Sequence, residues 1–164
     1  MLPLAPPGGA LITLIGAPGS GKSTFAARYP STWRLNLDTY RALATDDEKD
    51  QTATPVAAEI QNLLLDARLS RNLRVVVDST NLHTHIRAGL LARANYWKRP
   101  ALAVLFDVPL DTALARNAAR SRVVDPNVVT DLHHLVPTTE QLAAEGFDVV
   151  HLISDLRSTP DTHR

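Results

Sequence analysis

The residues best suited to do chemistry lie in one glycine-rich segment. It reads Gly16-Ala17-Pro18-Gly19-Ser20-Gly21-Lys22-Ser23-Thr24 and fits the Walker A pattern Gly-x-x-x-x-Gly-Lys-Ser. Glycines let the backbone curve around anionic oxygens, so that successive N–H groups point at them. We expect Lys22 to reach the β- and γ-phosphates of a nucleoside triphosphate and the Ser23 hydroxyl to hold Mg²⁺.

This loop indicates a triphosphate but does not tell what is done with it. GTPases normally carry an Asn-Lys-x-Asp motif that reads the base, and the sequence has none. A small kinase or ATPase that uses ATP and Mg²⁺ is therefore favoured.

A second polar group follows the second apolar run, in Asn36-Leu37-Asp38-Thr39-Tyr40-Arg41. If a helix begins at Asp38, the three-residue spacing brings Asp38 and Arg41 to one face. Asp38 would then accept a hydroxyl proton while Arg41 binds an anion on the same substrate. The alternative is that Asp38 only caps the helix.

The third apolar run, Val75-Val76-Val77, leads into Asp78-Ser79-Thr80-Asn81. An acidic residue after such a run is typical of a Walker B residue, which orients Mg²⁺ or its water shell. We expect Asp78 to share the metal site with Ser23 and, together with Asn81, to contact the substrate. The alternative for Asn81 is that it caps the next helix.

Basic residues are concentrated in the middle third of the chain. Residues 71–122 carry nine Lys/Arg against three Asp/Glu, although the whole chain has no formal net charge. Arg116 and Arg120 are one helical turn apart, as expected of a mobile lid that supplies arginines to a transferring phosphoryl group. The alternative is a solvated basic helix face.

These motifs need a scaffold that brings them together, and the apolar runs predict one. Short continuous apolar runs alternate with helical stretches, which favours an α/β fold with a parallel sheet of about five strands flanked by helices. Such sheets bind ligands at the carboxyl ends of their strands, where the polar groups above occur. Strands are expected at Leu11–Ile15, Trp33–Leu37, Leu73–Val77, Ala101–Phe106 and Val149–Ile153.

Helical stretches are expected between these strands. One begins at Thr54-Pro55, where proline suits the first turn, and runs to about Ser70. Its predicted buried face carries Val56, Ile60, Leu63, Leu64 and Ala67.

Length and composition agree with one compact domain. The chain has 164 residues, 45% of them apolar and 21% charged, which is near globular averages. We expect a loose N-terminal leader at 1–10, a single domain at 11–155 and a C-terminal tail at 156–164. The sequence lacks cysteine, a secretory signal pattern and an apolar run of membrane-spanning length, which favours a cytoplasmic protein with no membrane partner.

Taken in order, the motifs resemble the polynucleotide 5′-kinase group of P-loop phosphotransferases, which includes the kinase modules of phage and bacterial end-healing enzymes. The resemblance covers nearly the whole chain and implies a P-loop kinase fold with an arginine-bearing lid. It is carried by Gly-x-Pro-Gly-Ser-Gly-Lys-Ser at 16–23, Asp38-x-x-Arg41, the acidic loop 46–54, Asp78-x-Thr-Asn81 and the lid arginines.

The resemblance also implies a role for each motif. Two departures from the family pattern are Asn36-Leu37, where related modules usually have a serine, and the narrow spacing of Arg120-x-Arg122. The implied roles are general base for Asp38, contact with the phosphate beside the acceptor hydroxyl for Arg41, ATP·Mg²⁺ binding for Lys22 and Ser23, and lid function for Arg116 and Arg120.

The sequence therefore predicts a kinase that transfers the γ-phosphate of ATP to a nucleic acid hydroxyl, in particular the 5′-OH end of DNA or RNA. One alternative keeps the machinery and changes the acceptor to a hydroxymethyl base in DNA, a small alcohol or nucleoside, or an aminoacyl group. Another is an ATP-dependent switch that transfers nothing. The motifs leave the acceptor, the oligomeric state and the role of Arg122 open.

Overall fold

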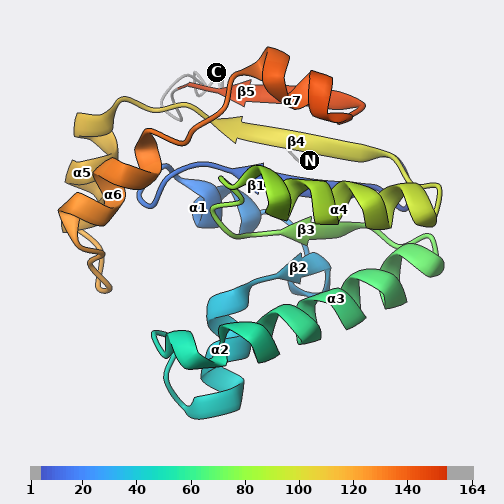
Figure 1. Cartoon of the computed structure of the whole chain (residues 1–164), viewed down its shortest axis with the longest axis horizontal. Helices are drawn as coiled ribbons and strands as arrows, with labels where there is room; N and C mark the ends of the chain where they lie inside the picture. Colours follow the sequence, from blue (N-terminus) through green and yellow to red (C-terminus); the bar gives the residue numbers. More distant parts are fainter. Residues whose placement is uncertain (1–4, 155–164) are drawn as a thin grey trace, which may run out of the picture.

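The computed structural model describes residues 5–154, which form a parallel sheet with helices on both faces (Figure 1). The strands are β1 (Leu11–Ile15), β2 (Arg34–Leu35), β3 (Val75–Val77), β4 (Ala101–Phe106) and β5 (Val149–Ile153). Their order is β2-β3-β1-β4-β5, and all four pairings are parallel, as predicted. The expected tail 156–164 and the first four residues of the expected leader lie outside the described residues.

The three central strands β3, β1 and β4 are buried along their whole length. In register, Leu11 of β1 lies beside Val75 on one side and Ala101 on the other. Continuous apolar runs of this kind arise because a parallel sheet is covered on both faces.

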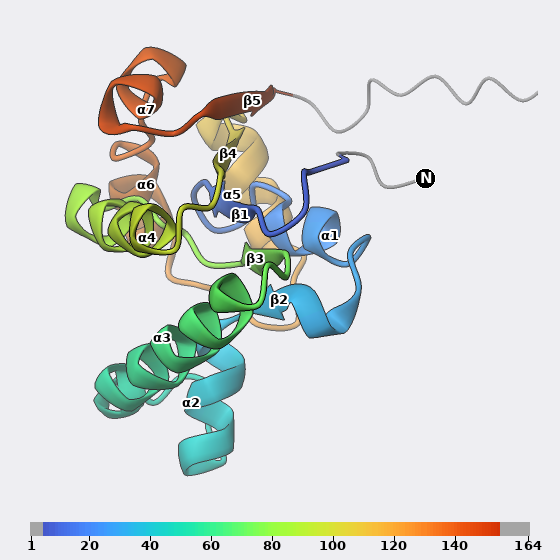
Figure 2. The same ribbon diagram turned by 90° about the vertical axis from the view of Figure 1, so that its right-hand side faces the viewer.

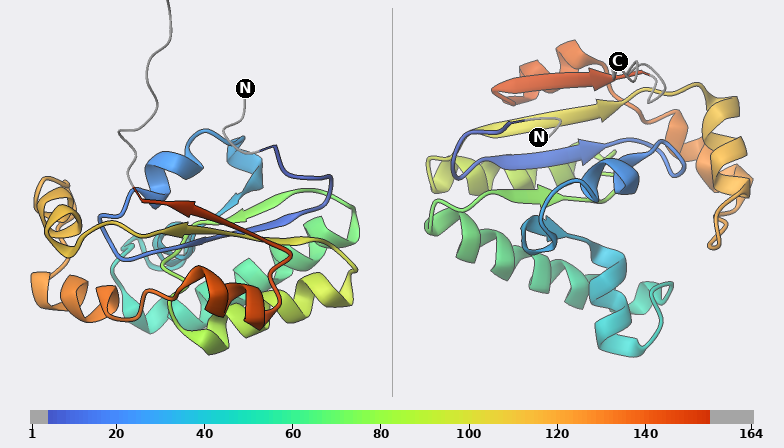
Figure 3. Two further views of the ribbon diagram at one scale, coloured as in Figure 1. Left: turned by 90° about the horizontal axis from the view of Figure 1, so that it is seen from above. Right: turned by 180° about the vertical axis from the view of Figure 1, so that it is seen from behind.

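The helices are α1 (Lys22–Ala26), α2 (Leu37–Thr45), α3 (Thr54–Ser70), α4 (Thr84–Tyr96), α5 (Leu110–Ala118), α6 (Pro126–His133) and α7 (Thr139–Glu145). Helices α3, α4 and α7 cover one face of the sheet, and α1 covers the other (Figure 2). Helices α5 and α6 project beyond the carboxyl ends of β1 and β4 (Figure 3). No helix within residues 5–154 is both long and apolar enough to cross a membrane.

Three predicted strands are confirmed at both ends, and two are shorter than predicted. The strand expected at Trp33–Leu37 is only Arg34–Leu35, because Trp33 ends a 3-10 turn and Asn36 caps α2. The early start of α2 brings Asp38 into its first turn.

The predicted buried face of α3 is wrong for several residues. Leu63 is 72% exposed and Val56 is 48% exposed. The prediction followed the large apolar side chains, whereas the helix packs through a row that begins at a small alanine and includes a polar residue. The buried residues, spaced four apart, are Ala57, Gln61, Leu65 and Leu69.

A buried ion pair joins α4 to α7. The Arg87 side chain is 1% exposed, and its Nε and Nη2 donate to the two carboxylate oxygens of Glu145 at 2.7 and 2.6 Å. Arg87 Nη1 also donates to the carbonyl oxygens of Asn81 and Leu82. These bonds lower the pKa of Glu145 and offset the cost of burying a guanidinium.

We expect Glu145→Gln to lower the free energy of unfolding by about 2–3 kcal/mol, because it leaves a buried guanidinium without its counter-charge. Denaturant unfolding at neutral pH measures this loss. Since the pKa of Glu145 is lowered in the folded state, its contribution is present above the ordinary glutamate pKa and is lost as the pH falls through the folded value. Glu59→Gln, an exposed change on α3, is the matched control, and equal losses in the two variants would contradict this assignment.

Candidate active site

The Walker A loop joins β1 to α1 and has no room for side chains at Gly16 and Gly19. A Cβ on Gly16 would lie 2.6 Å from Ser20 Oγ and 2.9 Å from Phe106 Cβ. Gly19 has a positive φ of 81°, and a Cβ there would lie 2.4 Å from the carbonyl oxygen of Ala113 on α5. The loop is therefore packed directly against α5, the helix that carries the predicted lid residue Arg116.

Lys22 is buried at the end of this loop. Its Nζ donates to the carbonyl oxygen of Ala17 at 2.8 Å and to Ser20 Oγ at 3.4 Å. Burial lowers the pKa of Lys22 to about 8, while the carboxylate of Asp78 raises this pKa and the guanidinium of Arg120 lowers it. Phosphate oxygens entering the loop would supply the negative charge that stabilises the protonated amine.

The residues predicted to hold Mg²⁺ lie together at the carboxyl ends of β1 and β3. Ser23 Oγ donates to Asp78 Oδ2 at 3.2 Å, and Asn36 Nδ2 donates to the Asp78 carbonyl oxygen at 3.0 Å. Burial raises the pKa of Asp78, and the charge of Lys22 opposes that rise. A hydroxyl and a carboxylate suit Mg²⁺, whose remaining positions are taken by water and phosphate oxygens, so these residues fit the ion.

Asn36 connects the pair predicted to bind the metal with the predicted acceptor side. Its Oδ1 accepts a hydrogen bond from the Thr39 backbone N–H at 3.2 Å and caps α2, while its Nδ2 holds Asp78. The sequence reasoning missed this residue as part of the site. An asparagine directly before a helix is a capping signal that would have located it.

Asp38 lies between two arginines from different parts of the chain. Arg41 Nη2 donates to Asp38 Oδ1, as the predicted helical spacing allows, and Arg122 Nη1 donates to Asp38 Oδ2 at 2.6 Å. Arg122 also pairs through Nε with Glu48 Oε1 at 3.5 Å. The sequence reasoning did not foresee the Arg122 contact, because 84 residues separate it from Asp38.

The predicted lid arginines lie on and just after α5. Arg116 is on the helix, but Arg120 is not, because α5 ends at Ala118. Arg116 Nη1 is buried and has no hydrogen-bond partner among the described residues. The charge of Arg120 is close enough to lower the pKa of Lys22. Arg120 therefore offers positive charge beside the Walker A loop.

The side-chain nitrogen of Asn81 does not contact the other predicted site residues and donates to backbone carbonyl oxygens instead. Asn81 is 4% exposed, and its Nδ2 donates to the carbonyl oxygens of Leu14 at 2.8 Å and Ser79 at 3.1 Å. It does not cap α4 either, since His83 occupies that position. Its nitrogen instead holds the end of β1 to the turn after β3.

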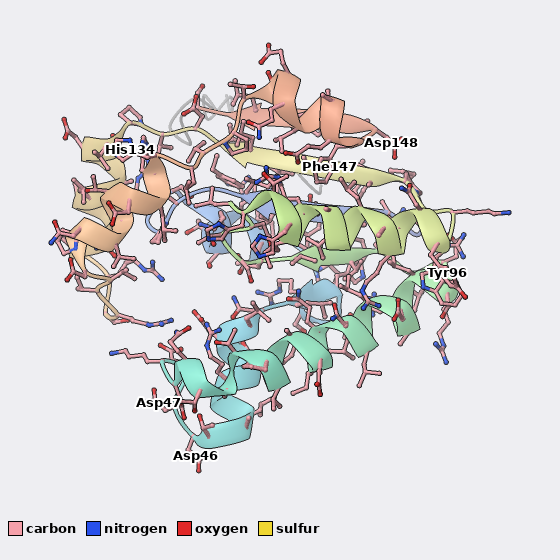
Figure 4. All side chains as sticks on the ribbon, viewed as in Figure 1. Asp46, Asp47, Tyr96, His134, Phe147 and Asp148 are labelled. Atoms are coloured by element: carbon pink, nitrogen blue, oxygen red, sulfur yellow. The ribbon has the colours of Figure 1, made fainter. Side chains whose placement is uncertain are left out.

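The acidic loop after α2 divides into an outer and an inner part. Asp46 and Asp47 are exposed and lie at the outer tip of this region, at the bottom of the view in Figure 4. Glu48 contacts two arginines, because its carbonyl oxygen accepts from Arg41 Nε at 3.0 Å and its carboxylate pairs with Arg122. One residue of this loop therefore belongs to the arginine–carboxylate cluster.

Known proteins share this fold and parts of the sequence. L-seryl-tRNA(Sec) kinase of Methanococcus maripaludis is 25% identical over 135 residues, which cover 78% of this chain and 52% of that protein. The Pnkp1/Rnl/Hen1 RNA repair complex contains a chain that superposes with a TM-score of 0.69 at 22% identity, covering 89% of this chain and 48% of that chain. The present chain thus spans about half the length of these relatives.

Other structures match over almost their whole length. A putative kinase from Chloroflexus aurantiacus has a TM-score of 0.64 at 15% identity, and covers 92% of this chain and 91% of its own. Kti12 of Chaetomium thermophilum in complex with ADP-AlF3 has a TM-score of 0.61 at 19% identity, with 88% of each chain covered. These likenesses establish the P-loop α/β fold. A family model described as AAA domain (AAA_33) matches residues 11–136, and the chain therefore belongs to that family.

Proposed function

We propose that this protein is a kinase that transfers the γ-phosphate of ATP to a nucleic acid hydroxyl, in particular the 5′-OH end of DNA or RNA. The observation that carries the proposal is the pair of hydrogen bonds made by the Asn36 side chain. One bond holds Asp78 on the triphosphate side, and the other caps the helix that bears Asp38. A carboxylate tied to the triphosphate site suits removal of a proton from an attacking hydroxyl. Arginines around it suit an acceptor that carries phosphate.

On the donor side, the loop and the lid supply positive charge where the transferring group gathers negative charge. Lys22 would bind the β- and γ-phosphates, and Ser23 with Asp78 would hold Mg²⁺. The ion, when bound, neutralises charge on the phosphate oxygens. Arg116 and Arg120 would stabilise the charge that spreads over the transferring phosphoryl group.

On the acceptor side, Asp38 would accept the hydroxyl proton as the oxygen attacks the γ-phosphorus. The bond from oxygen to the γ-phosphorus forms while the bond to the β-phosphate bridging oxygen breaks, and ADP leaves. Arg41 keeps the Asp38 carboxylate in place, because it donates to Asp38 Oδ1 and to the backbone of Glu48. This arrangement positions the base with respect to both α2 and the acidic loop.

The comparisons support this choice of reaction and of acceptor class. The relatives include an L-seryl-tRNA(Sec) kinase and a chain of an RNA repair complex. A second candidate function follows from the first of these, namely phosphorylation of a hydroxyl on an aminoacyl group attached to tRNA. An APS kinase of Mycobacterium tuberculosis also shares the fold, with a TM-score of 0.52 at 20% identity, so the fold alone does not select the acceptor.

Transfer of label from γ-labelled ATP to a panel of acceptors tests the proposal. The panel contains a 5′-OH oligonucleotide, the same strand already 5′-phosphorylated, seryl-tRNA with its 5′-phosphate retained, and DNA with hydroxymethyl bases and blocked ends. We expect label on the first acceptor and none on the second. Label on seryl-tRNA alone would establish the second candidate, and ATP hydrolysis without label on any acceptor would favour a switch.

We expect Asp38→Asn to lower the rate of transfer by about two to four orders of magnitude, because the amide keeps the shape but cannot accept the proton. ATP affinity should change little. Single-turnover transfer and equilibrium ATP binding measure the two effects separately. Asp46→Asn, at the exposed tip after α2, is the matched control and should keep full activity. A collapse of ATP binding in Asp38→Asn would move Asp38 to the metal site.

We expect ATP affinity to weaken as the pH rises through about 8, because burial lowers the pKa of Lys22 to about 8 and only the protonated amine carries charge. Binding at this pH should also take up a proton. Calorimetry in buffers with different ionisation heats measures both effects. Lys22→Ala should bind ATP weakly and without this pH step, and an unchanged wild-type affinity between about pH 7 and 9 would refute the prediction.

A further inference from the structure

Arg122 forms a bridge that neither the Walker A loop nor the lid accounts for. It follows α5, in a segment that reaches toward the α2 region in Figure 1. Arg122 donates from Nη1 to Asp38 Oδ2 at 2.6 Å and pairs through Nε with Glu48 at 3.5 Å. It therefore joins the lid side of the molecule to the predicted base.

The segment that carries Arg122 is held at both of its ends. Asn117 Nδ2 donates to the carbonyl oxygen of Val124 at 2.7 Å, and the Val124 N–H donates to Asn117 Oδ1 at 3.0 Å. Asn117 is 1% exposed, so this pair of bonds comes from a buried side chain and fixes both ends of the segment between residues 117 and 124. Arg122 can change its partner without unfolding the elements on either side.

Arg41, the arginine that the family resemblance assigns to the acceptor phosphate, is already occupied. Its Nε donates to the Glu48 carbonyl oxygen, its Nη1 donates to Thr54 Oγ1 at 3.4 Å, and its Nη2 donates to Asp38. The Arg41 side chain is only 9% exposed, whereas that of Arg122 is 23% exposed. Turning Arg41 toward a substrate would break the contacts that hold the acidic loop to α2.

Both oxygens of Asp38 accept hydrogen bonds from guanidinium groups. Release of one of these donors would free a carboxylate oxygen for the hydroxyl that gives its proton to Asp38. Arg122 is the displaceable one, because it is more exposed and comes from a loop, whereas Arg41 is buried within the acceptor region. The displaced guanidinium needs a new anion, and a phosphate beside the acceptor hydroxyl provides one.

We propose that Arg122 binds the phosphate next to the acceptor hydroxyl and covers Asp38 until that phosphate arrives. This inference rests on the proposed function and deepens it, because it assigns acceptor selection to Arg122 and leaves Arg41 as a positioning residue. Glu48 keeps the guanidinium oriented through Nε during the exchange. An acceptor without a neighbouring phosphate cannot draw Arg122 away from Asp38 and is therefore a poor substrate.

Steady-state kinetics with two small acceptors test this assignment. A nucleoside 3′-monophosphate carries a phosphate on the same sugar as the reacting 5′-OH. The matching nucleoside has the 5′-OH but lacks this phosphate. We expect Arg122→Ala to lower kcat/KM for the monophosphate by about tenfold to a hundredfold, the worth of a charge-assisted hydrogen bond, and to leave the nucleoside unchanged or improved. Arg122→Lys should recover part of the preference, since it keeps the charge and loses the fork.

Two further variants separate acceptor selection from a merely structural role. Glu48→Gln removes the charge of the second partner of Arg122. If the bridge only holds the lid side to the acceptor side, this variant should lower kcat/KM for both acceptors equally. Lys98→Ala, an exposed charge removal before β4, is the matched control and should leave both acceptors unchanged. Thermal unfolding of each variant verifies that it is folded.

The outcomes distinguish this inference from the proposed function. If the wild-type protein labels none of the three acceptors, namely the monophosphate, the nucleoside and a 5′-OH oligonucleotide, the proposed function is refuted. The inference is then refuted with it. Wild-type labelling together with an equal loss for both acceptors in Arg122→Ala overturns the inference alone. An unchanged monophosphate-to-nucleoside preference in that variant also overturns it.

Discussion

The side chain of Asn36 is the constraint on which the site depends. Its oxygen caps α2 and its nitrogen donates to Asp78, so one amide determines both where α2 begins and where Asp78 lies. Because α2 starts directly after β2, Asp38 is placed two residues from Asn36. The distance between the proposed proton acceptor and the proposed triphosphate site is thus controlled by short-range backbone geometry and one hydrogen-bonded amide.

The sheet determines the rest of the arrangement. Parallel strands end at the same edge, so the residues after β1, β2 and β3 meet there although they are far apart in the chain. Gly19 lets the Walker A loop approach α5 closely, which brings the region after this helix next to the same edge. Burial lowers the pKa of Lys22 and raises the pKa of Asp78, and the charge of each group opposes the shift of the other.

Local patterns predicted much of this molecule, and long-range contacts account for what they missed. Continuous apolar runs predicted both ends of three strands, and the glycine spacing predicted the loop. Both patterns depend only on residues that are neighbours in the sequence. The apolar stripe of α3 failed because packing selected a row that starts at Ala57 rather than the bulkiest side chains. The pairing of Arg122 with Asp38 has no local signal, and the burial of Arg41 depends on a loop that folds back over it.

The ion pair between α4 and α7 bears on where this fold can be divided. The region shared with the AAA domain family ends at residue 136, whereas Glu145 and β5 come after it. A fragment cut at that border would keep Arg87 in the apolar interior and lose the carboxylate that neutralises it. It would also expose the edge of β4 along the register that β5 now covers. The smallest cooperative unit is therefore larger than the segment that the family model matches.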